Sequence, residues 1–368
     1  MSVRDIELLR LLRWCRFIAP ASLGTVFSKA EIVNLSGAGF IKKHPGSGAY
    51  VLTAKAGRLL DSVFEGEVLP QLQRGYRESD IHRRLHIARL VLTAYRAWVH
   101  VFTTCIDDLA SPPALFLPSN RRGYGTNPWA NGRIAAVAVL GDTAYAVHHI
   151  RPGIGKLLFS DELAAFTRNI SPLKPAAHAF LFCGDSYVEL LSELEHLEDS
   201  DADRLICYGE AFRRLRLPAH LLACNDTGAL QLQLMSRPNY REKLTRIALK
   251  AKYTPPPKDF PPCDAFFEGT PFIMAADMDL RRIDAAIEAA RDKNCGPIVL
   301  VALEGQADAI LYARYRDTGK ARVFTLTDSA LKEFLGPGAA LYEPSNGPFI
   351  TAKGELIDAP LIQTHRKA

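Results

Sequence analysis

Residues 28–53 read SKAEIVNLSGAGFIKKHPGSGAYVLT, and this stretch decides the predicted fold of the N-terminal region. It opens with Ser28 and Glu31, an S-x-x-E capping box in which a hydroxyl and a carboxylate satisfy orphan backbone donors at a helix N-terminus. Gly37 and Gly39 end that helix. The stretch therefore predicts a short helix between the capping box and the two glycines.

A β-hairpin is predicted directly after this helix. Phe40 and Ile41 begin one strand, and Tyr50 begins the returning strand. Between them, residues 45–48 (Pro-Gly-Ser-Gly) supply turn positions at which φ is positive. Three residues that carry or can carry positive charge stand near the tip of the hairpin: Lys42, Lys43 and His44. The sequence thus predicts a helix followed by a basic hairpin.

Two further helices are expected before this stretch. Residues 3–18 space apolar side chains on one helix face and leave Arg10, Arg13 and Arg16 on other faces. Pro20 suits the first position of a second, shorter helix, because its missing N–H has no intrahelical partner there. Three helices followed by a hairpin are the signature of a winged helix-turn-helix, whose third helix docks in the major groove while the hairpin contacts phosphates.

Double-stranded DNA, bound in a sequence-specific way, is therefore the leading partner that the sequence predicts. The contact residues expected on the third helix are Lys29, Ala30, Val33 and Asn34. Those expected on the hairpin are Lys42, Lys43, His44, Ser47 and Tyr50, and those on a later helix over residues 80–98 are Arg83 and Arg84. The alternative hypothesis is an interaction adaptor, in which the winged helix binds another protein.

The distribution of charge favours the DNA hypothesis. The 368 residues carry a formal net charge of +5. Residues 1–100 contain 15 Lys or Arg against 8 Asp or Glu, whereas the remaining 268 residues contain 30 against 32. The positive charge thus belongs to the part of the chain that holds the hairpin, as neutralisation of phosphates would require.

Several classes of protein and site are not predicted. No apolar run reaches the roughly 18 residues needed to span a bilayer, and Arg4, Asp5 and Glu7 leave no room for a signal-peptide core, so a cytoplasmic location is expected. His82 and His86 have i, i+4 spacing but lack a Glu or Cys at the spacing of known zinc motifs, and no metal is predicted.

The cysteines form no close pair in the sequence, which predicts thiols rather than disulfides or a zinc ribbon: Cys15, Cys105, Cys183, Cys207, Cys224, Cys263 and Cys295.

Residues 79–172 are expected to form a second region, with a helix, a hairpin that turns at Gly141-Asp142, and another helix. This is the outline of a restriction-endonuclease-like core, which needs an acid on one strand and an acid-x-Lys on the next to hold Mg²⁺ and activate water. The corresponding strands read PALFLP at 113–118 and YAVHHI at 145–150, without such acids. We therefore expect a degenerate core and no enzymatic activity.

A Mg²⁺-dependent nuclease or nicking enzyme remains the alternative to this interpretation. Its acids would have to come from segments that are not adjacent, for instance Asp107 or Asp108 together with Asp142.

The last region, residues 173–368, alternates strand-like and helix-like segments, which predicts an α/β domain with a partly parallel sheet and a proline-rich connector at 254–263. It contains no G-x-G-x-x-G and no Walker motif, so no nucleotide or other small-molecule cofactor is predicted. Together with residues 1–78, the winged helix-turn-helix, these regions define a mixed α/β protein of three domains.

A family resemblance agrees with the N-terminal prediction. The segments RDIELL at 4–9, residues 33–41 and YVLTAKAG at 50–57 resemble the winged helix of the replication-relaxation proteins of plasmids and integrative elements. The later helix with His82 and the hairpin after it are similar in order to that family's second, nuclease-like region. The resemblance covers about the first 170 residues and implies a mobile-element protein that acts on transcription, replication or DNA relaxation. Because one short recognition helix reads few bases, we expect a homodimer.

Overall fold

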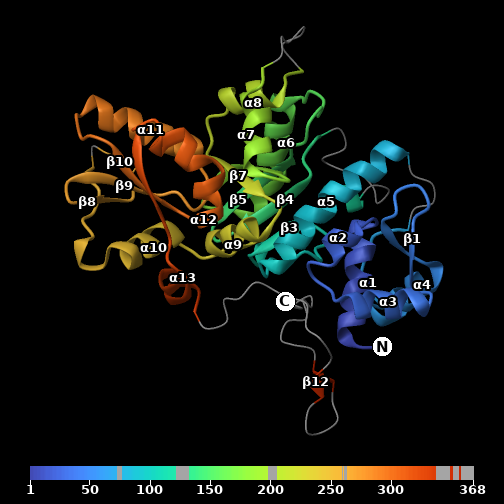
Figure 1. Ribbon diagram of the computed structural model, residues 1–368. Helices are drawn as coiled ribbons and strands as arrows, with labels where there is room; N and C mark the ends of the chain where they lie inside the picture. Colours follow the sequence, from blue (N-terminus) through green and yellow to red (C-terminus); the bar gives the residue numbers. More distant parts are fainter. Residues whose placement is uncertain are drawn as a thin grey trace. The chain divides into compact units, whose positions relative to one another are not determined.

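The computed structural model describes residues 1–72, 77–121, 132–197, 205–258, 260, 263–336, 349–350 and 356–357. The fold is mixed α/β and divides into two compact units (Figure 1). One contains residues 1–130 and 341–368, and the other contains residues 131–340. Within the described ranges, no helix combines the length and the apolar character needed to cross a membrane.

The first unit begins with three helices and a hairpin, drawn in blue in Figure 1. Its elements are α1 (Val3–Cys15), α2 (Pro20–Leu23), α3 (Lys29–Gly37), β1 (Ile41–Lys43), β2 (Tyr50–Leu52), α4 (Ala54–Val63), α5 (Glu78–Arg96), η1 (Asp107–Ala110), β3 (Ala114–Phe116), η2 (Pro118–Arg121), β12 (Phe349–Ile350) and β13 (Leu356–Ile357).

The capping box predicted for the third helix is confirmed. The Ser28 hydroxyl accepts the backbone N–H of Glu31, and the Glu31 carboxylate accepts that of Ser28. Strands β1 and β2 pair in antiparallel register, and Ile18 adds a bridge to Tyr50. In the turn between them, Gly48 has a positive φ of 66°, whereas the other three turn residues do not.

The first helix differs from the prediction. It ends at Cys15, and its residues from Glu7 onward are all buried, including the arginines that the sequence pattern places on other faces. Arg10 lies against the ring of Phe64 (4.3 Å to the centroid) and pairs with Glu67 at 2.8 Å. Arg13 pairs with Asp61 at 3.1 Å. Arg10 and Arg13 are buried and engaged in ion pairs inside the unit, so their charge is not offered to a ligand.

The second unit contains two sheets. Its elements are β4 (Ala136–Leu140), β5 (Thr143–His149), α6 (Phe159–Ile170), η3 (Ser171–Leu173), β6 (Ala177–Gly184), α7 (Tyr187–Glu195), α8 (Tyr208–Arg214), β7 (Ala219–Ala223), α9 (Asp226–Met235), α10 (Tyr240–Leu249), η4 (Lys250–Lys252), β8 (Ala265–Phe267), β9 (Thr270–Met274), α11 (Leu280–Asp292), β10 (Ile298–Ala302), α12 (Glu304–Gln306), η5 (Ala307–Arg316), β11 (Ala321–Thr325) and α13 (Asp328–Leu335).

The first of these sheets has the strand order β4-β5-β6-β7 within the unit. Strands β4 and β5 form the predicted antiparallel hairpin, and β5, β6 and β7 run parallel. The domain boundary predicted between residues 172 and 173 lies between β5 and β6, which pair from Thr143↔Ala177 to His149↔Cys183. The predicted second region is also divided, because α5 belongs to the first unit and the hairpin to the second.

The second sheet has the order β11-β10-β9-β8, with β9, β10 and β11 parallel and β8 antiparallel to β9. Helices α10 and α11 pack on β9 and lie on opposite sides of this sheet (Figure 1). A bridge between His220 and Asp279 connects β7 of the first sheet to the segment between β9 and α11. The partly parallel α/β organisation predicted from the alternating segments is therefore confirmed. Part of the predicted connector joins the second sheet, since Thr254 pairs with Phe266.

Candidate functional site

The outer face of α3 carries the residues that the sequence places in the recognition helix. Ile32 and Leu35 are buried against the rest of the unit, whereas the predicted contact residues are all exposed: Lys29, Ala30, Val33 and Asn34. Val33 keeps 55% of its surface in contact with solvent. The four side chains are therefore accessible to another molecule.

The hairpin next to α3 presents two lysines. Lys42 and Lys43 are exposed, and the Lys43 ammonium lies 5.9 Å from the centre of the Tyr50 ring. His44 is half-buried, with its Nδ1 3.2 Å from the Ser47 hydroxyl and its ring edge-on to Phe17. The lysines are thus available to a ligand, whereas His44 and Tyr50 are half-buried and contact other residues of the unit.

This part of the surface is positive. From residue 17 to residue 60 the charged side chains are five basic residues, all exposed, and one acid, Glu31. The Glu31 carboxylate is already engaged, because it caps α3 and pairs with Arg4 at 2.9 Å. The basic surface, as we define it, consists of Lys29, Lys42, Lys43, Lys55 and Arg58.

Two predicted contact residues lie on α5 and differ in exposure. Arg83 is half-buried, and Arg84 is buried. The Arg84 guanidinium donates to the Ser119 hydroxyl at 3.0 Å and to the Asn120 side-chain oxygen at 3.2 Å. Asn120 in turn donates to the carbonyl of Trp14. Arg84 therefore holds the segment around Ser119 in place and does not belong to the surface predicted for DNA.

A second cluster, in the other unit, was not predicted from the sequence. His149, Cys183 and Cys224 stand at the carboxyl ends of the parallel strands β5, β6 and β7, and their ligand atoms all lie within 4.8 Å of one another. His149 and Cys183 are register partners, and Cys224 lies two residues beyond Leu222, the partner of Cys183. Because side chains alternate along a strand, these positions share one face of the sheet.

The neighbouring histidine, His148, points to the opposite face and belongs to the core. Its ring stacks on Phe180 with centroids 5.6 Å apart and meets Tyr208 edge-on. Burial lowers the pKa of His148 to about 3, so the ring is neutral at physiological pH. The adjacent histidines singled out by the sequence thus have different surroundings, as the alternation of a strand dictates.

The two thiols of the cluster have different acidities. A hydrogen bond with the Cys183 thiol, opposed by burial and helped by His149, lowers the pKa of Cys224 to about 6. Burial raises the pKa of Cys183 well above its usual range. The surroundings thus favour the thiolate form on Cys224 and the thiol form on Cys183.

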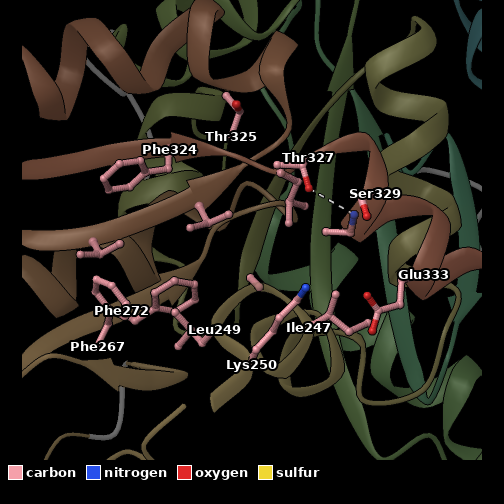
Figure 2. Close-up of a pocket in the computed structure, with 15 residues that line it drawn as sticks. Ile247, Leu249, Lys250, Phe267, Phe272, Phe324, Thr325, Thr327, Ser329 and Glu333 are labelled. Atoms are coloured by element: carbon pink, nitrogen blue, oxygen red, sulfur yellow. Dashed lines mark hydrogen bonds between the residues drawn. The ribbon is translucent and has the colours of Figure 1, made fainter. Parts of the chain in front are cut away.

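Figure 2 shows a pocket of about 410 Å³ over the second sheet, between α10, β11 and α13. Phe267 and Phe272 lie on one side of it, and the charged ends of Lys250 and Glu333 lie toward the other. Apolar side chains make most of its lining, and neither histidine nor cysteine is found among its described lining residues. The pocket is therefore suited to a mainly apolar group with a polar end near Lys250 and Glu333.

Another pocket, of about 330 Å³, opens beside a buried ion-pair network. Asp277 is fully buried and accepts hydrogen bonds from the Tyr240 hydroxyl at 2.6 Å and from Arg241. Burial alone would raise the pKa of Asp277, but the guanidinium groups of Arg241 and Arg282 outweigh it and hold that pKa well below its usual range. Asp264, which lines the pocket, pairs with Arg282 at 2.7 Å. These charges neutralise one another, which indicates a structural network.

The acids of the alternative nuclease hypothesis are placed as follows. Asp107 and Asp108 lie in the first unit, and Asp142 lies in the second. The Asp108 carboxylate accepts the backbone N–H of Cys105 at 3.1 Å and so caps its own turn. Comparison with known proteins adds no assignment: no family model matches the chain, and neither a curated protein nor a solved structure matches it.

Proposed function

We propose that this protein is a sequence-specific double-stranded DNA-binding protein. The observation that carries the proposal is the basic surface formed by α3, the hairpin and the start of α4. It contains five exposed basic residues, and the one acid in this part of the chain, Glu31, is already paired with Arg4. The order of helices α1 to α3 and strands β1 and β2 is that of a winged helix-turn-helix. In that arrangement the third helix enters the major groove and the hairpin lies over the backbone.

The side chains divide into two groups by the contact they can make. Val33 and Asn34 are short, exposed and adjacent on α3, so they fit the edges of bases: an amide can pair with adenine, and a branched apolar group can contact a thymine methyl. Lys42 and Lys43 carry mobile charges on the hairpin and fit phosphates. We expect two copies to bind, because one such helix reads too few bases for specificity.

The process served is a further proposal, which rests on the resemblance of the N-terminal segments to replication-relaxation proteins. It places the protein on a plasmid or other mobile element, where it would regulate transcription or act on replication or relaxation. DNA selected from random-sequence duplexes by the full chain would reveal the preferred site. Its position in the surrounding genome would then distinguish an operator from a replication origin.

Changing Lys42 and Lys43 together to Ala is expected to weaken DNA binding roughly tenfold at about 0.1 M salt. Affinity falls as salt rises, and each phosphate contact contributes about 0.9 to the steepness of log affinity against log salt. The double variant should therefore have a plot that is less steep by up to about 2. Fluorescence anisotropy with the selected duplex, over a salt series, measures both quantities. The matched control is Lys320→Ala, an exposed lysine of the other unit. If the double variant has the affinity and salt slope of the control, the hairpin takes no part in binding.

Changing Asn34 to Ala is expected to cost about 1–3 kcal/mol of binding free energy on the selected duplex and little on a scrambled one, because a base contact carries sequence information. The measurement is competition between the two duplexes for wild type and variant. An equal loss on both duplexes would mean that Asn34 contacts the DNA backbone rather than a base. No loss on either duplex would contradict the placement of α3 in the major groove.

A further inference from the structure

We propose that His149, Cys183 and Cys224 form a binding site for a thiophilic divalent metal ion, Zn²⁺ above all. The three residues come from three adjacent parallel strands and present two sulfur atoms and one imidazole nitrogen to a common point. This inference concerns the second unit and is independent of the DNA-binding proposal.

The separations of the ligand atoms suit zinc. In a tetrahedral site with Zn–S near 2.3 Å and Zn–N near 2.0–2.1 Å, ligand atoms lie roughly 3.4–3.8 Å apart. The atoms of this cluster are all within 4.8 Å of one another, so small side-chain rotations suffice to bind an ion. Hard ions such as Mg²⁺ and Ca²⁺ prefer oxygen, whereas two thiolates with an imidazole select zinc and similar soft ions.

The backbone fixes the three ligands in place. The N–H of Ile150, directly after His149, donates to the Cys183 carbonyl at 2.7 Å. The N–H of Cys224 donates to the Gly184 carbonyl, also at 2.7 Å. Each ligand thus sits at, or directly beside, a hydrogen bond that ties its strand to the next. Such preorganisation lowers the cost of assembling a metal site.

Asp185 is a candidate for a fourth ligand, because it neighbours His149. This residue follows β6, its side chain is exposed, and its carboxylate lies within 4.8 Å of a ring nitrogen of His149. Two cysteines and one histidine with an open fourth position are a ligand set of catalytic zinc, whereas a fourth protein ligand is typical of structural zinc. In this proposal Asp185 or a water completes the coordination.

The test is zinc binding to the reduced full chain after treatment with a chelator, measured by competition with a chromophoric zinc indicator. We expect one high-affinity Zn²⁺ per chain and a rise in melting temperature when zinc is added. Co²⁺ in its place should give the thiolate-to-metal charge-transfer absorption and the intense visible bands of a tetrahedral sulfur site. Wild type without these bands, or without stoichiometric zinc, would overturn the proposal.

Variants separate the site from adventitious binding. Cys224→Ser, at a half-buried position, is expected to bind zinc at least about 100-fold more weakly and to lose the charge-transfer band, since even outer-shell changes cost 10–100-fold. Cys295→Ser, also half-buried and outside the cluster, is the matched control and should behave as wild type. Circular dichroism of the zinc-free variants checks their folding. Equal affinity of Cys224→Ser and the control would refute the site.

The rival explanation is that Cys183 and Cys224 form a redox-active disulfide, because their sulfur atoms lie within 4.8 Å of each other. Peptide mapping under non-reducing conditions distinguishes the two. A Cys183–Cys224 disulfide in protein whose reduced form binds no zinc contradicts the proposal. Zinc that protects Cys224 from alkylation, with Cys295 still modified, supports it. Asp185→Asn should retain zinc but alter the visible spectrum of the Co²⁺ form, which reports on the fourth position.

Discussion

Changing Asp277 to Asn is expected to lower the free energy of unfolding by about 3–5 kcal/mol, the usual cost of removing one partner from a buried ion pair. Asp277 has no exposed surface, and Arg241 and Arg282 both depend on its carboxylate for compensation. Asparagine has nearly the same shape, so the change creates little cavity. Its effect reports the loss of the negative charge, after which Arg241 and Arg282 lack the buried carboxylate that both contact.

The same variant should change how stability depends on pH. The pKa of Asp277 in the folded protein lies below its ordinary value of 3.8, because Arg241 and Arg282 outweigh the effect of burial. A carboxylate with a depressed pKa contributes stability that is fully present above the ordinary value and is lost as pH falls through the folded value. The difference between wild type and Asp277→Asn should therefore be constant near neutral pH and shrink below about pH 4.

Urea unfolding at several pH values measures both effects. Glu242→Gln is the matched control, because it also removes a carboxylate from an arginine pair, but one in which both side chains are 56% exposed. Pairs of this kind contribute only about 0.3–0.5 kcal/mol. A difference of less than 1 kcal/mol for Asp277→Asn, or one that persists unchanged at pH 3, would show that the network does not stabilise the fold in this way.

Local signals in the sequence predicted the elements that local interactions determine. The Ser28 and Glu31 capping box and the Gly141-Asp142 hairpin involve residues at most a few positions apart, and both are present in the structure. The buried arginines of α1 could not be predicted in this way. Arg10 is compensated by Glu67, which is 57 residues away, and a helical pattern says nothing about a partner at that distance.

The Cys-His cluster was missed for a related reason. Zinc motifs are recognised by ligands a few residues apart, whereas His149, Cys183 and Cys224 are each separated by more than 30 residues. A usable signal was nevertheless present: Cys183 ends the strand-like segment at 179–183, Cys224 ends the one at 220–224, and His149 stands near the end of the hairpin strand at 143–150. Parallel strands bring their carboxyl ends to one edge of a sheet, so residues at these ends become neighbours. The spacing of residues within one segment cannot reveal such a cluster, whereas the order of the strands in the sheet can.

Changing Gly228 to Ala is expected to lower the free energy of unfolding by about 3 kcal/mol, the upper end of the usual cost of overpacking. An added Cβ would lie 1.7 Å from the carbonyl oxygen of Ala223, a backbone atom that cannot rotate away. The first turn of α9 would have to move from the end of β7, which also strains the cap in which Asn225 accepts the N–H of Gly228. The reason is steric, because Gly228 does not have a positive φ.

The same substitution at Gly37 provides the control. Gly37 is the last residue of α3, and an added Cβ there meets nothing within 4 Å. Alanine restricts the unfolded chain and favours the helix, so Gly37→Ala should leave stability unchanged or raise it by up to about 1 kcal/mol. Thermal and urea unfolding of the two variants should thus shift in different directions or by very different amounts. Equal effects would mean that α9 does not approach the end of β7 as closely as described.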